Sequence, residues 1–174
     1  MINPVFLRAH ANRAAFREAR WEIEEFNAEY CAVLDDGRLE DWPHFFERDA
    51  FYNITSRENY DRGLPVGLVY CEGQAMLFDR ALAITRTTMF GPRYLRHYLA
   101  NTRVTDIDEA GGLISSETNY ILIETVADSP YGRLHQAGRM LDKFARQPDG
   151  RLLLRSRICV YDTLLVNNAL VLPV

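Results

Sequence analysis

The C-terminal half of the sequence alternates long strand-like segments with tight turns, and this pattern constrains the fold most. Strands are expected over residues 93–107, 113–126, 133–146 and 151–164. The segments between them are Gly111-Gly112, Ser129-Pro130-Tyr131-Gly132 and Gln147-Pro148-Asp149-Gly150. Such Gly- and Pro-containing segments are typical of turns between antiparallel strands. The pattern therefore predicts a four-stranded antiparallel meander.

Charged residues interrupt the last two of these strands, which are otherwise apolar. Arg139 and Asp142 lie in the third strand, and Arg155 and Arg157 lie in the fourth. A sheet with one buried and one solvated face does not need charges in this arrangement. Their presence predicts that the second face meets a polar pocket or another protein chain.

The N-terminal half has helical periodicity instead. Apolar residues recur at steps of three and four over residues 13–34, at Phe16, Ala19, Ile23, Phe26, Tyr30 and Val33. A short helix around Trp42, a strand over 50–56, a loop over 57–67 and a helix over 72–88 are expected to follow. Helices before a meander predict an α+β domain, in which the helices pack on a strongly curved, mostly antiparallel sheet. We expect this packing to leave a cone-shaped cavity at the open end.

The composition suits one soluble domain over residues 1–174, with residues 1–13 as a candidate extended arm. Of the 174 residues, 48% are hydrophobic and 25% are charged. The formal net charge of −4 argues against non-specific nucleic-acid binding. The sequence shows no apolar run that could span a membrane and no signal-peptide core, so no membrane partner and a cytoplasmic location are expected.

Motifs for metals, nucleotides or a serine nucleophile are not found. His10, His44, His97 and His135 are scattered, and they show no spacing typical of a metal site. The three cysteines, Cys31, Cys71 and Cys159, are far apart, which indicates neither a disulfide framework nor a zinc or iron–sulfur site. We therefore assign no catalytic or metal-binding residue and expect no cofactor in this chain.

Acid–base chemistry inside the cone is the remaining chemical hypothesis. The candidate pocket residues are Tyr52, His97, Tyr120 and Asp142, because burial shifts the pKa values of such groups. Each also has a structural interpretation, which we favour. The tyrosines and His97 would be hydrogen-bonded core residues, and Asp142 would form an ion pair with Arg155 or Arg157.

Arginines are concentrated in the meander, and they are the expected contact residues for another subunit. Guanidinium groups make planar, bidentate contacts and are enriched at interfaces. The predicted interface consists of Arg96, His97, Arg103, Arg139, Arg155 and Arg157, together with Leu172 and Val174 of the C-terminal tail. Because a loose apolar tail would be a liability, residues 170–174 should dock on this domain or on a partner.

Four blocks of sequence occur in a specific order along the chain. They are Asp41-Trp42-Pro43-His44-Phe45-Phe46 with Ala50-Phe51-Tyr52, Arg96-His97 with Asn101-Thr102-Arg103-Val104, Gly138-Arg139 with Asp142-Lys143-Phe144, and Arg155-Ser156-Arg157-Ile158-Cys159-Val160-Tyr161-Asp162. Together they resemble the small (β) subunits of the Rieske-type aromatic-ring-hydroxylating dioxygenases. The resemblance extends over residues 26–174.

The resemblance implies a cystatin-like fold of the SnoaL and nuclear-transport-factor type, in agreement with the periodicity. It also implies assembly with a larger α subunit and with copies of this chain, as an α₃β₃ hexamer. The α subunit would carry a Rieske [2Fe-2S] cluster and mononuclear Fe(II), with electrons from NAD(P)H through a reductase. This chain would have a structural role. Residues 57–64 and the ending Leu172-Pro173-Val174 are most similar to relatives acting on aromatic carboxylates, of the terephthalate or salicylate type.

Two other hypotheses remain open from the sequence. The first is a stand-alone SnoaL-like dehydratase or isomerase, which would use His97 with Tyr52 or Asp142 and would need no other protein. The second is a small-ligand binding module without chemistry. An open cavity lined by these side chains would favour either of them.

Overall fold

Residues 13–87, 90–108, 112–163, 165, 170 and 172–174 are described by a computed structural model of the chain. The elements in chain order are α2 (Arg13–Asp35), the 3-10 helix η1 (Trp42–Phe45), β1 (Phe46–Ser56), α3 (Arg57–Asp61), β2 (Val69–Glu72), α4 (Gln74–Arg86), β3 (Arg93–Asp108), β4 (Leu113–Val126), β5 (Arg133–Arg146) and β6 (Leu152–Tyr161). Except for Arg13, the candidate arm lies outside the described residues.

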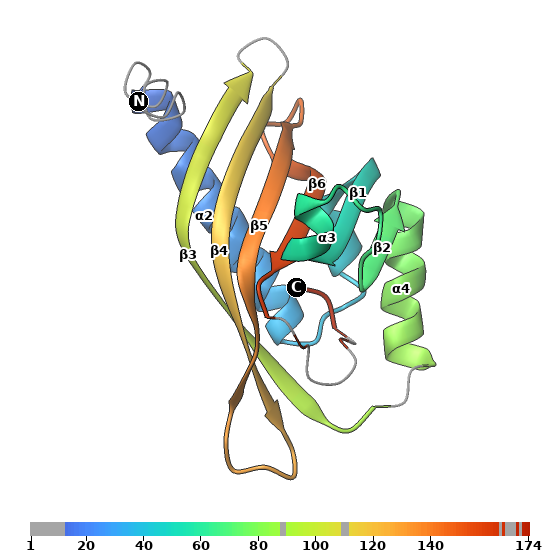
Figure 1. Cartoon of the computed structure of the whole chain (residues 1–174). Helices are drawn as coiled ribbons and strands as arrows, with labels where there is room; N and C mark the ends of the chain where they lie inside the picture. Colours follow the sequence, from blue (N-terminus) through green and yellow to red (C-terminus); the bar gives the residue numbers. More distant parts are fainter. Residues whose placement is uncertain (1–12, 88–89, 109–111, 164, 166–169, 171) are drawn as a thin grey trace.

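The strands form one six-stranded sheet in the order β2-β1-β6-β5-β4-β3 (Figure 1). Strands β3 to β6 form the predicted antiparallel meander. Strand β1 joins β6 in parallel, with Tyr52 opposite Arg157, and β2 pairs antiparallel with β1 at the outer edge. The curved, mostly antiparallel sheet is therefore confirmed, and the β1–β6 pair makes it mixed.

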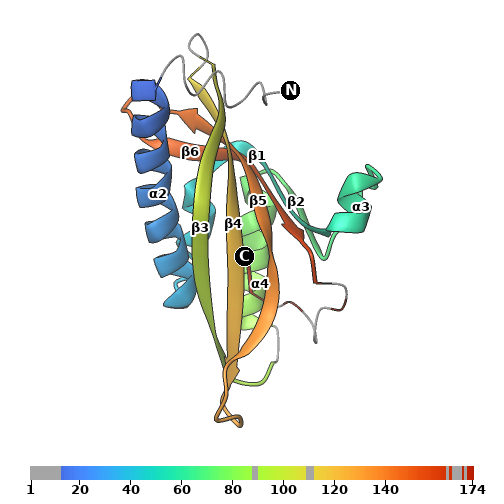
Figure 2. The ribbon, with the colours of Figure 1, turned by 60° about the vertical axis from the view of Figure 1, so that its left-hand side comes forward.

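Helix α2 packs on β3 and lies on one side of the sheet (Figure 2), where it runs behind β3, β4 and β5 in the view of Figure 1. Its buried residues recur at helical spacing and include Ala19, Ile23, Tyr30 and Val33. The predicted apolar stripe is thus confirmed, but Asn27 lies within it and is also buried. Helix α4 packs at the other end of the sheet, beside η1, β1 and β2.

Two short elements differ from the sequence expectation. The predicted loop over 57–67 begins with α3, which is capped because the Asn59 amide donates to the Ser56 hydroxyl at 3.1 Å. The predicted helix over 72–88 starts only at Gln74, after Gly73 with a φ of 80°. Strand β2 precedes this helix. Helix α3 and strand β2 are both too short to produce a clear periodicity in the sequence.

The core lies between α2, η1 and the concave side of the sheet. Trp42, Phe46 and Tyr52 pack edge to face, with ring centroids 5.2 to 5.7 Å apart. The C-terminal residue Val174 is buried in the same cluster, and Leu172 packs against it. The chain's own tail therefore fills the part of the interior beside Tyr52, where the sequence predicts a cone-shaped cavity.

Candidate subunit interface

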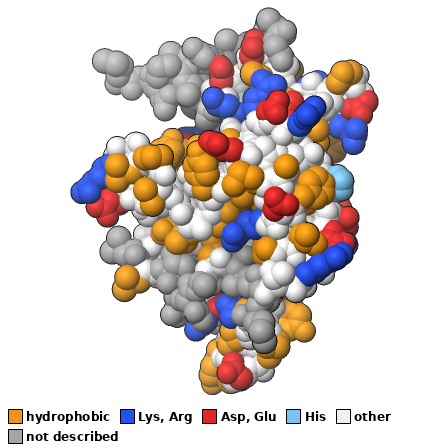
Figure 3. Space-filling view, turned by 90° about the vertical axis from the view of Figure 1, so that its right-hand side faces the viewer, with side chains coloured by type: hydrophobic (Ala, Val, Ile, Leu, Met, Phe, Trp, Pro, Cys, Tyr) orange, Lys and Arg blue, Asp and Glu red, His pale blue; other side chains and the backbone are white. Residues whose placement is uncertain are grey.

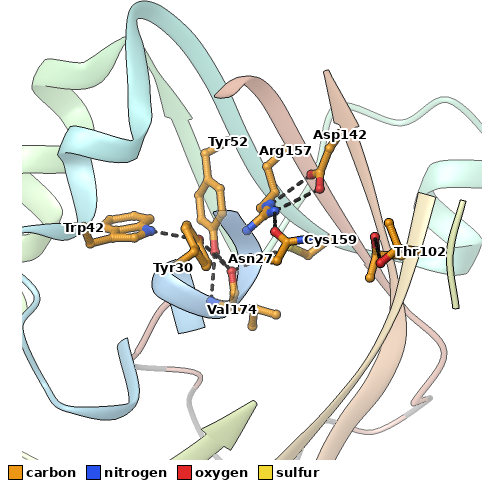
Figure 4. A network of polar contacts seen from close by, with 10 residues as sticks. Asn27, Tyr30, Trp42, Tyr52, Thr102, Asp142, Arg157, Cys159 and Val174 are labelled. Atoms are coloured by element: carbon orange, nitrogen blue, oxygen red, sulfur yellow. Dashed lines mark hydrogen bonds and ion pairs between the residues drawn. The ribbon is translucent and has the colours of Figure 1, made fainter. Parts of the chain in front are cut away.

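Arg157 is fully buried at the centre of a polar network (Figure 4). Its Nε and Nη2 atoms each donate to the Asp142 carboxylate at 2.9 Å, and Nη2 also donates to Asn27 Oδ1 at 2.6 Å. The Tyr30 ring lies 4.2 Å from the guanidinium carbon. The predicted ion pair of Asp142 is confirmed. The interface role of Arg157 is wrong, because a side chain without exposed area cannot reach a partner.

Arg157 stays cationic over the whole physiological pH range. Burial alone would lower the pKa of Arg157, but the Asp142 carboxylate outweighs burial and holds this pKa well above its ordinary value. Burial also raises the pKa of Tyr30, so its hydroxyl stays neutral and can donate a hydrogen bond. The ion pair therefore ties β5 and β6 to α2 through Asn27.

Tyr30 and Tyr52 hold the end of the chain (Figure 4). Their hydroxyls donate to a main-chain oxygen of Val174 at 2.9 and 3.0 Å, and the Val174 amide donates to the Tyr52 hydroxyl at 2.9 Å. Burial raises the pKa of Tyr52 well above its ordinary value. The tail is thus docked on this domain, and Val174 must be removed from the predicted interface. For the half-buried Leu172 an interface role stays a prediction.

The other two pocket candidates also have internal partners. His97 Nδ1 lies 2.7 Å from the Asp35 carboxylate, and the side chain is buried, which excludes it from the predicted interface. The Tyr120 hydroxyl donates to Gln136 at 2.8 Å. Each pocket candidate therefore has its own structural partner, as the structural interpretation predicts. The sequence gives little signal for Asp35, because it lies 62 positions from His97.

Four arginines of the predicted interface lie at the surface. Arg96 pairs with Asp35, Arg103 and Arg139 share Glu117, and Arg155 pairs with Glu47. Surface ion pairs of this kind contribute only about 0–1 kcal/mol, so a partner's carboxylates can replace them at little cost. For these four residues the interface role stays a prediction.

An exposed apolar strip, which the sequence pattern does not reveal, connects α3 to β2. It consists of Leu64, Val66, Leu68 and Tyr70. Figure 3 shows hydrophobic side chains gathered on this side of the molecule. In the sequence, these apolar residues recur at every second position, which is typical of a strand, but Gly63, Pro65 and Gly67, which alternate with them, favour a loop.

The three cysteines are free and buried. Burial raises the pKa of Cys31 to about 12, which leaves the thiol protonated and unreactive. Within the described residues, no group of three or more His, Cys, Asp and Glu side chains could hold a metal ion. In that same part of the chain, no helix is long and apolar enough to cross a bilayer.

Comparison with known proteins places this fold in a defined class. Residues 16–158 match the SnoaL-like domain family. The small subunit of anthranilate 1,2-dioxygenase from Burkholderia cepacia is 34% identical over 154 residues, which cover 88% of this chain and 93% of that protein. A β subunit of the terminal oxygenase component of terephthalate 1,2-dioxygenase from Comamonas sp. is 30% identical over 152 residues, which cover 87% and 96%.

A solved structure leads to the same family. It is a β subunit assigned to an aromatic-ring-hydroxylating dioxygenase of Novosphingobium aromaticivorans, with 35% identity, a TM-score of 0.80 and coverage of 90% of this chain and 96% of that one. The chain therefore belongs to the small, or β, subunits of the aromatic-ring-hydroxylating dioxygenases. The resemblance and the fold class expected from the sequence are both confirmed.

Proposed function

We propose that this chain is the structural β subunit of a multicomponent oxygenase that acts on an aromatic carboxylate. The names of its relatives support the substrate class, because anthranilate and terephthalate are both aromatic carboxylates. One observation carries the structural role. Each side chain that would line a catalytic cone instead contacts an internal partner, as Tyr52 does with Val174 and Asp142 with Arg157, so these side chains serve the fold.

The redox chemistry belongs, in this proposal, to a larger α subunit. That subunit would carry the Rieske [2Fe-2S] cluster and the mononuclear Fe(II), and it would receive electrons from NAD(P)H through a reductase. Three copies of each subunit would form an α₃β₃ hexamer in the cytoplasm. The present chain would contribute its surface arginines Arg96, Arg103, Arg139 and Arg155 to contacts with the α subunit and with its own copies.

Affinity purification of the tagged chain from its own host tests this function. We expect a larger, red-brown chain to co-purify in equal amount, with iron by metal analysis and an iron–sulfur absorption spectrum. A colourless chain that purifies alone would contradict the proposal. Turnover of an aromatic compound by the isolated chain would contradict it as well, since that result would favour a stand-alone SnoaL-like enzyme.

A further inference from the structure

A pocket of about 470 Å³ lies between α2 and β3, which run side by side in Figure 2. Its apolar lining consists of Ala28, Cys31, Ala32, Leu99 and Ala100. A cavity of about 150 Å³ already holds a benzene molecule, so this pocket has room for a substituted aromatic ring. Ligand sites are typically apolar, with a few polar groups that orient the ligand. Two polar side chains of the lining, Asn27 and His97, have the properties of such groups.

Asn27, on α2, has a buried amide nitrogen without a hydrogen-bond partner. The residue is 3% exposed, and its Oδ1 atom accepts a hydrogen bond from Arg157 Nη2 at 2.6 Å (Figure 4). Because a guanidinium group only donates, the acceptor must be the amide oxygen, which leaves the nitrogen Nδ2 for another partner. Among the described residues, Nδ2 has no such partner. A buried N–H without an acceptor is unfavourable, so a ligand that accepts from Nδ2 gains affinity here.

His97, on β3, has a second unpartnered nitrogen. Its side chain is 1% exposed, and Nδ1 lies 2.7 Å from the Asp35 carboxylate. An ionised carboxylate only accepts, so Nδ1 carries a proton, and the buried Nε2 is left without a partner in the part of the chain that the structure describes. Nε2 accepts a hydrogen bond when the ring is neutral and donates one when the ring is protonated. A hydroxyl group satisfies Nε2 in either state, because a hydroxyl both donates and accepts.

The charged side chains of the lining already have partners of opposite charge. Glu24 pairs with Arg20 at 2.8 Å, and Asp35 pairs with Arg96 at 3.2 Å. A charged ligand would therefore have to compete with an internal ion pair and would lose its own hydration on entering the pocket. A neutral ligand avoids both costs, so the lining favours a neutral molecule.

The two unpartnered nitrogens are separated along α2. Asn27 and Asp35 are eight residues apart on this helix, which corresponds to about 12 Å along its axis. His97 is held at the Asp35 end by its hydrogen bond. The two nitrogens therefore require two separate polar groups on the ligand. A rigid ring with a polar group at each end fits this requirement, because it loses little conformational freedom on binding.

We propose that this pocket binds a small, neutral, hydroxylated aromatic compound. The hydroxyl group bonds to His97 Nε2, and a second polar group across the ring, an acceptor such as a carbonyl, bonds to Asn27 Nδ2. The apolar lining covers the ring. This binding site goes beyond the proposed structural role and does not depend on it, because the residues that line the pocket all belong to this chain.

Ligand titration of the full-length chain, followed by NMR, tests the site. The probe is methyl 4-hydroxybenzoate, which is neutral and carries a phenol hydroxyl opposite an ester carbonyl. We expect a dissociation constant of about 1 mM for a ligand of this size. Methyl benzoate, which lacks the hydroxyl, should bind about tenfold more weakly. In His97→Asn the amide keeps a donor for Asp35 but Nε2 is removed, so this variant should bind both esters equally weakly.

A blocking variant determines where the ester binds. Ala28→Leu enlarges an exposed side chain of the pocket lining, and it should abolish the binding of both esters. Ala75→Leu is the matched control, because Ala75 is an exposed alanine on α4, outside the pocket. The control should bind both esters like the wild type. Circular dichroism checks that each variant is folded.

Several results would overturn the inference. They are a wild type that shows no saturable binding of methyl 4-hydroxybenzoate, equal affinities of the wild type for the two esters, and undiminished binding by Ala28→Leu or by His97→Asn. If His97→Asn does not fold, the comparison of the two esters in the wild type still tests the bond to Nε2. The titration uses this chain alone, whereas co-purification tests the proposed function, so the failure of one proposal is distinguished from the failure of the other.

Discussion

At the scale of single residues, the buried Arg157–Asp142 pair is the most sensitive point of the domain. Removing one partner leaves an uncompensated charge inside the protein, which typically costs about 3–5 kcal/mol. We expect Arg157→Met to lower the free energy of unfolding by this amount in urea denaturation. The double variant Asp142→Leu/Arg157→Met should recover much of the loss, because no charge remains unpaired.

Arg155→Met is the matched control for this experiment. Arg155 lies on the same strand, but it is half exposed and pairs with Glu47 at the surface. Its replacement should change the free energy of unfolding by about 0–1 kcal/mol. If Arg157→Met costs no more than the control, the buried pair does not stabilise the fold.

His135 gives the fold a pH dependence. Burial lowers its pKa in the folded chain, against the opposing effect of Glu124, while the unfolded value is about 6.5. Between the two values the unfolded chain binds more protons, so the free energy of unfolding falls as the pH drops below about 6.5 and levels off below the folded pKa. When the pH is lowered from about 7.5 to about 5, the free energy of unfolding should fall more in the wild type than in His135→Gln. An equal loss in both proteins would contradict this assignment.

At the scale of elements, the close approach of β5 and β6 depends on Gly138. A β-carbon at this position would collide with the Val160 carbonyl and crowd the Tyr161 backbone. Gly138→Ala should therefore lower the free energy of unfolding by about 1–3 kcal/mol, because backbone must move. Gly91→Ala is the control, since no atom lies within 4 Å of the added carbon. Equal melting temperatures for the two variants would show that the strands separate without cost.

The docked tail is a second element with a measurable contribution. Deletion of residues 172–174 removes the acceptor of the Tyr30 and Tyr52 hydroxyls. A buried hydroxyl without a partner costs about 1–3 kcal/mol, so thermal unfolding should occur at a clearly lower temperature. Leu165→Ala changes a side chain between β6 and the tail that is 86% exposed, and it should leave the melting temperature unchanged.

The two arginines of β6 show what sequence reasoning can and cannot reach. Turn chemistry and periodicity were sufficient to predict α2 and the meander, and the motif blocks were sufficient to predict the family. Arg155 and Arg157 are two positions apart, so in a regular strand their side chains would point to the same side of the sheet. On the neighbouring strand, Lys143 pairs with Ser156 and the next residue, Phe144, pairs with Leu154. Arg155 is therefore the extra residue of a β-bulge, and the two arginine side chains point to different sides. Partners distant in sequence, such as Asp35 and His97, give no local signal.

At the scale of the whole molecule, the exposed charge of Arg103 should control assembly without affecting the fold. We expect Arg103→Glu to weaken the complex with the α subunit and its copies about tenfold, or about 1.4 kcal/mol, because repulsion replaces attraction to carboxylates. The measurement is dissociation on dilution by mass photometry. Arg62→Glu is the control, because Arg62 directly follows α3 and its side chain is more exposed than that of Arg103. A loss of melting temperature that parallels the loss of assembly would show that Arg103 serves the fold instead.

The parallel pairing of β1 with β6 has a consequence for the timing of folding. Strand β1 is complete at residue 56 and β6 spans residues 152–161, so the first strand made must wait for the last one. Within the sheet, the edge strand β2 pairs with β1. Such distant pairings slow folding, and an emerging chain leaves its unpaired strands open to aggregation. A ribosome must therefore have synthesised nearly the whole chain before the sheet can close, and only then can another subunit recognise its completed surface.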